Sequence, residues 1–355
     1  MRKERVGAGS REPGAGTSGA STADSRLPAP HRFGVAELHG GGARVSIIPA
    51  LGGKISAMEL GGRQWLWTSD TIPYAEPVDG ASYVETADSG GYDECFPTVG
   101  PCVLPSGIEK YGGLMLPDHG ELWAQRPAFE VETLGDAQQA TCVWTGRRMP
   151  YRFTRVVRVD GSGAVTMRYS VTNEGVPRLP FVWSSHPLLP LTPDTRIVLP
   201  DGARVRVYAE HRIDIGGALA EHRWPRITVA KKDKKKFVDF SRPDAVARNY
   251  ACKLFLDMPV GRAAVEEGNG ARLEVEYDAR EVPHFGLWLN RRGWTPFKGS
   301  LFRRARPYLN FAFEPCIGAP DPLSDALIAW QEVRWLEGGE TRSWTLTWRG
   351  GKGDA

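Results

Sequence analysis

Several features that identify common classes of protein are missing from this sequence of 355 residues. No apolar run approaches the roughly 20 residues that a helix needs to cross a bilayer, so we do not expect a membrane protein. The 45 basic and 42 acidic side chains leave a net charge of only +3, and no arginine-, glycine- and aromatic-rich repeat is present. We therefore expect no nucleic-acid partner.

Cysteine is scarce, and its spacing lacks the signatures of metal sites. The five cysteines are an odd number without a CxxC pair or a histidine at zinc-ligand spacing, namely Cys95, Cys102, Cys142, Cys252 and Cys316. Scattered thiols of this kind are typical of a reducing compartment. The pattern predicts a cytoplasmic protein with no metal and no other cofactor.

The first 30 residues hold almost no large apolar side chains and lack the apolar core of a secretory signal. They are rich in Gly, Ser, Ala, Arg and Pro, so apolar burial would not offset the entropy lost on ordering them. We predict a disordered tail over residues 1–30, a single sheet domain over residues 31–350, and a short C-terminal tail over residues 351–355.

Extended helical periodicity is also missing after residue 30, whereas short strand-like segments alternate with turns rich in glycine and proline. The clearest hairpin joins residues 151–159 to residues 164–173, because apolar and polar side chains alternate on both sides of a glycine turn. At least a dozen such segments predict an all-β fold, a large antiparallel β-sandwich. Residues 325–330 favour one short helix, and the lysine-rich run 231–236 is interpreted as a solvated loop.

Two residues, His186 and Glu314, each end an apolar strand-like segment. Pro187 forces an extended or turn geometry immediately after His186, and burial of Glu314 would raise its pKa towards that of a general base. At neutral pH a histidine can give a proton while a carboxylate takes one, which is the chemistry that opens and closes a hemiacetal. The alternatives are a core histidine and a buried glutamate held in a salt bridge.

His119 lies between Asp118 and Glu121 and directly before Gly120, where the backbone can come close to a ligand. A charged surface turn explains the same residues. Tryptophans are also candidates, because their flat apolar faces suit a sugar ring, although tryptophans of a sandwich often belong to its core. The candidates are Trp123, Trp183 and Trp288.

Seven short motifs occur in an order that resembles the aldose 1-epimerase, or galactose mutarotase-like, family over roughly residues 32–349. They include Gly52-Gly53, Phe96-Pro97, His119-Gly120, Trp183-Ser184-Ser185-His186-Pro187 and Glu314-Pro315. The resemblance implies a mutarotase-like supersandwich and a sugar substrate. It also implies that His186 protonates the ring oxygen, that Glu314 removes the proton of the C1 hydroxyl, and that His119 binds near the ring oxygen.

The sequence departs from the family pattern at two places. No arginine occurs between Thr68 and Cys95, the segment before Phe96-Pro97. Asp93 and Glu94 stand there instead, and we expect them to accept hydrogen bonds from sugar hydroxyls. Lys253 and Asp257 occupy the segment in which a sugar-binding aspartate of the family was expected.

The sequence therefore predicts an aldose 1-epimerase, a monomer or homodimer, with His186 and Glu314 as catalytic residues. The predicted sugar-binding residues are His119, Asp93, Glu94, Trp288 and Trp123. Whether the sugar is free or phosphorylated stays open, since a basic run that begins at Arg291 could bind phosphate or lie in solvent.

Two other functions fit the same residues. One is a carbohydrate-binding or sensor domain without catalysis. The other is a domain related to glycoside hydrolases or lyases, in which Asp118 or Glu121 would act with Glu314, because hydrolysis generally uses two carboxylates that flank the bond.

Overall fold

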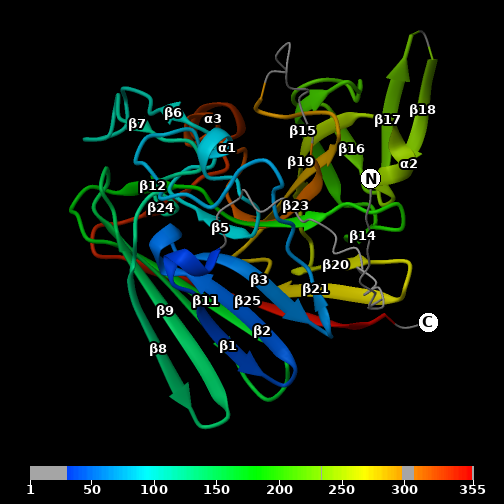
Figure 1. Cartoon of the computed structure of the whole chain (residues 1–355). Helices are drawn as coiled ribbons and strands as arrows, with labels where there is room; N and C mark the ends of the chain where they lie inside the picture. Colours follow the sequence, from blue (N-terminus) through cyan, green and yellow to red (C-terminus); the bar gives the residue numbers. More distant parts are fainter. Residues whose placement is uncertain (1–29, 233, 298–307, 354–355) are drawn as a thin grey trace, which may run out of the picture.

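A computed structural model describes residues 30–232, 234–297 and 308–353, and it consists mainly of two large antiparallel sheets (Figure 1). The all-β class and the large antiparallel sandwich predicted from the sequence are confirmed. Except for Pro30, the predicted N-terminal tail lies outside the described residues. At the other end, the last strand continues to Lys352, two residues into the segment predicted as a C-terminal tail.

The larger sheet has 13 strands, and β4 pairs only with β3 at one side of the main path. In spatial order, the main path is β1 (Ala36–Gly40), β2 (Ala43–Ile48), β3 (Lys54–Leu60), β5 (Tyr92–Cys95), β13 (Trp183–Pro190), β23 (Leu309–Ile317), β22 (His284–Arg291), β19 (Tyr250–Asp257), β15 (Arg204–His211), β16 (Glu221–Arg223), β17 (Arg226–Lys231) and β18 (Lys234–Asp239), and β4 is Arg63–Gln64.

The second sheet has eight strands. Their order is β14 (Arg196–Val198), β20 (Arg262–Glu266), β21 (Ala271–Tyr277), β25 (Thr341–Lys352), β11 (Val165–Asn173), β10 (Tyr151–Val159), β9 (Ala137–Thr145) and β8 (Ala128–Leu134). Two small ribbons pair β12 (Leu179–Phe181) with β24 (Arg334–Leu336) and β6 (Cys102–Val103) with β7 (Met115–Leu116).

Helices are few and short among the described residues. The α-helices are α1 (Tyr83–Thr86), α2 (Pro243–Val246) and α3 (Leu323–Asp325), and Pro30–Phe33 and Pro49–Leu51 form 3₁₀ turns. The π-helical turn Ala326–Trp330 continues from α3, in the region where the sequence favours a helix. None of the described helices has both the length and the apolar character of a membrane span.

The predicted hairpin forms β10 and β11, which pair over their whole length. Along β10 the buried side chains alternate with more exposed ones, because successive residues of a strand point to opposite faces. The buried face carries Tyr151, Phe153 and the fully buried Arg155, and it packs against the larger sheet. Alternating burial of this kind is what makes the sequence pattern of the hairpin recognisable.

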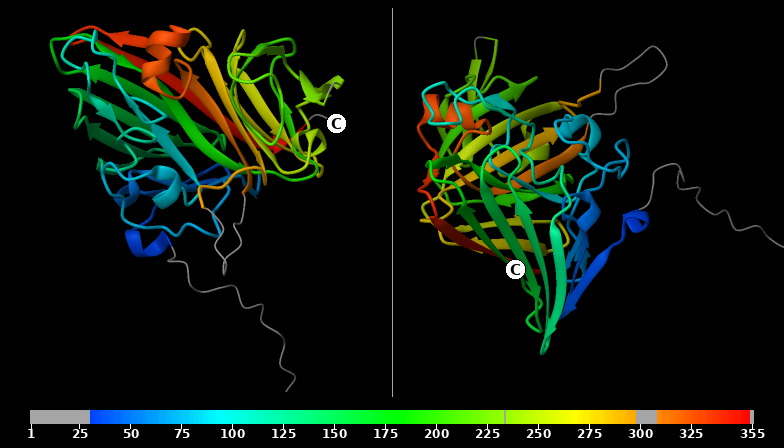
Figure 2. Two further views of the ribbon diagram at one scale, coloured as in Figure 1. Left: turned by 90° about the horizontal axis from the view of Figure 1, so that it is seen from above. Right: turned by 90° about the vertical axis from the view of Figure 1, so that its left-hand side faces the viewer.

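The centre of the larger sheet is buried on both faces. Strands β13, β19 and β23 are buried along almost every residue, because the second sheet covers one face and loops cover the other. Figure 2 shows the two layers and the short helices that lie outside them. This covered outer face of the larger sheet holds the candidate site.

The lysine-rich run is not the loop that the sequence suggests. Its residues end β17 and begin β18, and Lys231 pairs with Lys234 in the sheet register. The lysines of this hairpin, all of which are described by the structure, are exposed. A solvated location was thus predicted correctly, but the conformation is strand rather than loop.

Candidate functional site

A cavity of about 480 Å³ lies on the outer face of the larger sheet. Strands β13, β23, β22 and β19, which are neighbours in the sheet, form its floor through His186, Glu314, Trp288 and Lys253. Its walls come from loops that are distant in the sequence and include Asp88, residues 99–101, Asp118, His119 and residues 321–322. A volume of this size accommodates a monosaccharide.

His186 and Glu314 meet on the floor of this cavity. The ring nitrogen Nδ1 of His186 lies 3.1 Å from Oε1 of Glu314, and Ser184 donates its hydroxyl to Oε2 at 3.3 Å. Both side chains are almost fully buried. The carboxylate fits because its partner on β22 is Gly286, where a Cβ atom would lie only 2.5 Å from Oε2.

Lys253 is a functional candidate that the sequence reasoning did not select as a site residue. Its ammonium contacts Oε2 of Glu314 and lies 3.1 Å from the carboxylate of Asp321. Burial alone would raise the pKa of Glu314, but the charges of Lys253 and His186 outweigh it and lower this pKa to about 2. The expectation of a raised pKa is therefore wrong, because a neighbouring cation dominates over burial.

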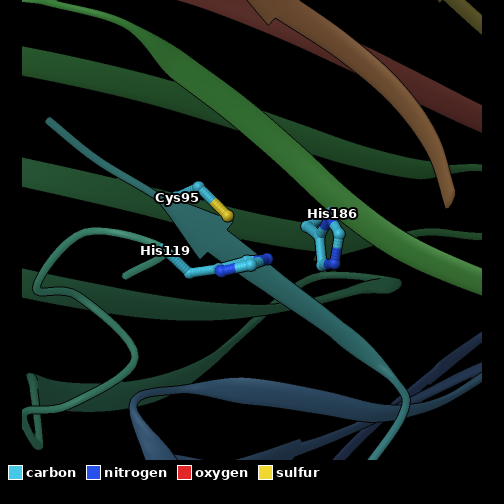
Figure 3. Close-up of side chains that lie close together, drawn as sticks. All are labelled: Cys95, His119 and His186. Carbon is cyan, nitrogen blue, oxygen red and sulfur yellow. The ribbon is translucent and has the colours of Figure 1, made fainter. Parts of the chain in front are cut away.

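His119 approaches His186 from the loop that follows β7. Its Nδ1 lies 2.8 Å from Oδ1 of Asp118, its ring stacks on Tyr83 at a centroid distance of 4.1 Å, and the two histidine rings lie 5.0 Å apart (Figure 3). Burial lowers the pKa of His119, but the carboxylate of Asp118 outweighs this effect and raises the pKa above its usual value.

Gly120 serves a different purpose from the one expected. A Cβ atom at this residue would lie 2.2 Å from the carbonyl oxygen of Phe96, so the glycine permits close approach to the protein backbone and not to a ligand. Its neighbour His119 has a positive φ of 57°. This tight packing fixes the histidine loop to the end of β5.

Asp93 and Glu94 do not line the cavity as predicted. They are consecutive on β5, so their side chains point to opposite faces of the sheet. Glu94 faces the second sheet and binds Arg155, Tyr169 and Trp183 at 3.0–3.2 Å. The prediction that Glu94 binds a sugar is wrong, because its carboxylate belongs to a polar network in the core.

Asp93 is the register partner of His186 on the neighbouring strand and points to the face of the sheet opposite to Glu94, but it does not line the cavity. Its Oδ2 accepts hydrogen bonds from Lys54 and from the hydroxyl of Tyr83, the latter at 2.6 Å. Tyr83 in turn stacks on His119. Asp93 therefore contacts Tyr83, the residue on which His119 stacks, and does not contact the cavity directly.

The tryptophans have different locations. Trp288 lines the cavity, whereas Trp183 is fully buried in the core and donates to Glu94. Trp123 packs edge-on against Tyr83, and its indole nitrogen donates to the carbonyl of Asp118 at 2.9 Å. The prediction that Trp123 contacts a sugar is thus wrong, since it fixes the histidine loop from behind.

Some polar groups of the cavity were missed by the sequence reasoning. Asp88 and Asn310 line the cavity, and in each an oxygen, Oδ1, is buried without a hydrogen-bond partner among the described residues. His211 also lines it, with its ring 6.2 Å from that of Trp288. These residues come from separate strands and loops, and no local motif connects them.

The chain is similar in fold to several solved structures. A protein from Escherichia coli described as a candidate aldose 1-epimerase has a TM-score of 0.60 and 17% identity, with 90% of this chain and 99% of that chain covered. A galactose mutarotase-like protein from Clostridium acetobutylicum has a TM-score of 0.60 and 12% identity, with 89% and 94% covered. The fold is that of the galactose mutarotase-like proteins.

A galactose mutarotase related enzyme from Lactobacillus acidophilus gives the same result, with a TM-score of 0.57, 15% identity, and coverage of 90% of this chain and 98% of that chain. No protein-family model and no curated protein sequence matches the chain. The short motifs of the sequence predicted a mutarotase-like fold, and this prediction is confirmed.

Proposed function

We propose that this protein is an aldose 1-epimerase, which interconverts the α and β anomers of a sugar in the cavity above β13 and β23. The observation that carries the proposal is the buried pair of His186 and Glu314, 3.1 Å apart on the floor of a cavity of about 480 Å³. The fold shared with mutarotase-like proteins supports it.

In this proposal His186 and Glu314 move one proton each. Because Nδ1 of His186 faces Glu314, the other ring nitrogen is left to donate to the ring oxygen of the sugar. Glu314 takes the proton of the C1 hydroxyl as the bond between C1 and the ring oxygen breaks, which leaves a free aldehyde. Rotation about the C1–C2 bond and reversal of both transfers then close the other anomer.

The contact with Lys253 defines the resting state of the base. A pKa of about 2 keeps Glu314 ionised throughout the neutral range, so it is always ready to accept a proton. The same low pKa makes it a weak base. Concerted donation from His186 would compensate for this weakness, because no full charge then develops on the sugar.

His119 and Trp288 would bind the sugar in this account. His119 lies beside His186 and is oriented by Asp118, and Trp288 offers an apolar surface next to Lys253 on the cavity floor. The unpaired oxygens of Asp88 and Asn310 would accept hydrogen bonds from sugar hydroxyls.

One observation favours a second candidate, a sugar-binding domain without catalysis. The ion pair of Lys253 with Glu314 is the buried salt bridge that the sequence left as an alternative, and it lowers the basicity of the carboxylate.

For the hydrolase alternative, Glu121 is excluded as a cavity residue, because its carboxylate is fully buried and binds Arg148 and Tyr151 outside the cavity lining. Asp118 does line the cavity, but its carboxylate is paired with the ring of His119 at 2.8 Å.

The basic run gives no support to a phosphorylated substrate, because neither Arg291 nor the exposed Arg292 lines the cavity. Arg291 pairs with Asp244 at 2.6 Å, and Lys298, Arg303 and Arg304 of the same basic run lie outside the described residues.

Polarimetry tests the proposal directly. Freshly dissolved α-D-glucose, α-D-galactose and their 6-phosphates are followed to the anomeric equilibrium with and without the protein. We expect faster relaxation with at least one of these sugars. Binding of a sugar by calorimetry without any acceleration of its mutarotation would support the binding domain and contradict the proposed enzyme.

A further inference from the structure

Three potential metal ligands meet beside the candidate site although they are far apart in the sequence. Cys95 ends β5, His119 lies in the loop that follows β7, and His186 lies on β13. One ligand atom of each, the sulfur of Cys95 and a ring nitrogen of each histidine, lies within 4.8 Å of the other two. Figure 3 shows the cysteine and the two rings directed at a common region.

Both histidines are oriented as metal-binding histidines usually are. Nδ1 of His119 faces Asp118 at 2.8 Å, and Nδ1 of His186 faces Glu314 at 3.1 Å. A histidine that gives its Nδ1 hydrogen to a carboxylate presents the lone pair of Nε2 to a metal ion, and such carboxylates are the common outer partners of zinc ligands. Two carboxylate-oriented histidines beside one thiol are therefore a suitable donor set.

We propose that Cys95, His119 and His186 bind a zinc-type divalent ion, with the fourth position directed into the cavity. Two imidazoles and one thiolate suit Zn²⁺, which takes nitrogen at about 2.0–2.1 Å and sulfur at about 2.3 Å in tetrahedral geometry. Such bonds place the donor atoms about 3.3–3.6 Å apart, so small side-chain rotations must close the present separation. On binding, the Cys95 thiol releases its proton to solvent and the sulfur bonds to the ion.

The second group of potential ligands in the described residues differs from the first in its charge environment. Asp257, His284 and Glu332 also lie within 4.8 Å of one another. However, the guanidinium of Arg206 already contacts both carboxylates, at 3.0 Å from Asp257 and 2.5 Å from Glu332. A cation is thus already supplied by the protein at that position. Among the described residues, by contrast, the ion pairs of His119 and His186 are with the carboxylates of Asp118 and Glu314 and not with an arginine or lysine.

Binding of this ion would also affect mutarotation, and this expectation rests on the proposed function. The ion would use the same lone pair of His186 that carries the transferred proton. Metal-bound protein would then lack its general acid. We expect Zn²⁺ to inhibit mutarotation reversibly, and a chelator to restore it.

Metal binding is tested on the purified full-length protein with Co²⁺ and Zn²⁺ alone. We expect one Co²⁺ per chain, a near-ultraviolet charge-transfer band from the cobalt–thiolate bond, and displacement of Co²⁺ by Zn²⁺. In Cys95→Ser the band should disappear. The affinity for Zn²⁺ should fall by more than about 100-fold, because removing a residue that only hydrogen-bonds to a metal ligand already costs about 10–100-fold, and Cys95 is itself a proposed ligand. Cys252→Ser is the matched control, since Cys252 is equally buried but outside the group.

Absence of stoichiometric Co²⁺ binding in the wild type, or a band that persists in a folded Cys95→Ser variant, would overturn the inference. Circular dichroism and thermal unfolding establish that each variant is folded. The two proposals fail separately: mutarotation without metal binding removes only the zinc site, and metal binding without mutarotation of any aldose removes only the proposed enzyme.

Discussion

Two buried glutamates, Glu94 and Glu314, lie on nearby strands of the larger sheet but have opposite acid–base properties. Glu94 points between the two sheets, and burial raises its pKa to about 7 despite the charge of Arg155. Glu314 points into the cavity, and there Lys253 and His186 overcome the effect of burial and lower its pKa to about 2. Both carboxylates are at most 3% exposed.

The difference shows that burial alone does not define the chemistry of a carboxylate. Arg155 also donates to the carbonyl of Gly53 and to the sulfur of Cys142, so it is shared among several acceptors. Glu314 has a lysine and a histidine as direct partners. The core network can hold a proton near neutral pH, whereas the cavity holds an ionised carboxylate beside His186 and Lys253.

The largest effect is expected from removing the proposed acid. His186→Asn should lower the turnover number for mutarotation by about 10²–10⁴, the usual loss when a positioned proton-transfer group is removed. The control is His39→Asn, because the ring of His39 is exposed, lies 3.3 Å from Glu37 and is outside the cavity lining. Polarimetry at saturating sugar measures both variants, and an equal activity in the two would contradict the role of His186.

The two glutamates should contribute to stability in different pH ranges. The unfolded chain binds more protons than the folded chain at Glu314 between pH 4.5 and about 2, so this contribution is lost as the pH falls through that range. At Glu94 the folded chain binds more protons between pH 4.5 and about 7, so stability declines as the pH rises.

Each pKa differs from 4.5 by about 2.5, and at about 1.4 kcal/mol for each pH unit this corresponds to about 3–4 kcal/mol. Urea unfolding between pH 2 and pH 8 measures the effect. Glu314→Gln should flatten the acidic branch, and Glu94→Gln should flatten the decline towards pH 7. The same pH dependence in both variants would show that the two sites do not differ as described.

Removing the lysine should shift the acidic limit of activity. Lys253→Met takes away a charge that lowers the pKa of Glu314, so the acidic limb of kcat/KM should move to higher pH by at least about one unit. Lys54→Met is the matched control, since Lys54 is equally buried but pairs with Asp93. An acidic limb that stays in place in Lys253→Met would exclude Lys253 as the group that sets the state of Glu314.

The smallest effect concerns the apolar surface of the cavity. Trp288→Ala should raise KM about ten-fold, or about 1.4 kcal/mol, with little change in kcat, because the contact is the same in the sugar and in its transition state. Trp123→Phe, which alters a tryptophan outside the cavity lining, should change KM by less than about two-fold. A larger effect on KM of Trp123→Phe than of Trp288→Ala would support the sequence-based prediction that Trp123 contacts the sugar.

The strand pattern was predictable because it is local. The β10–β11 hairpin alternates apolar and polar side chains around a glycine turn, and each half can be recognised without its neighbours. By contrast, the segment predicted as a loop around Lys231 belongs to a strand pair. The lysine run 231–236 itself contains no apolar residue whose alternation would have revealed these strands.

The candidate site was only partly predictable, because its residues come together through the sheet order. His186 and Glu314 were found at the ends of apolar runs, and the fold makes β13 and β23 neighbours. Lys253, which sets the charge of Glu314, lies on β19, two strands away from β23. The opposite orientations of Asp93 and Glu94 could have been anticipated from strand alternation, but which of the two faces the core depends on the register with β13.

The central claim is that Glu314, and not Glu94, takes part in proton transfer at C1. The most direct measurement is ¹H NMR exchange spectroscopy, which follows the interconversion of the two anomers through their C1 proton signals. It is made on the most active sugar with equal amounts of wild type, Glu314→Gln and Glu94→Gln. We expect exchange in the wild type and in Glu94→Gln and a loss of about 10²–10⁴ in Glu314→Gln. Undiminished exchange in a folded Glu314→Gln variant would contradict the account.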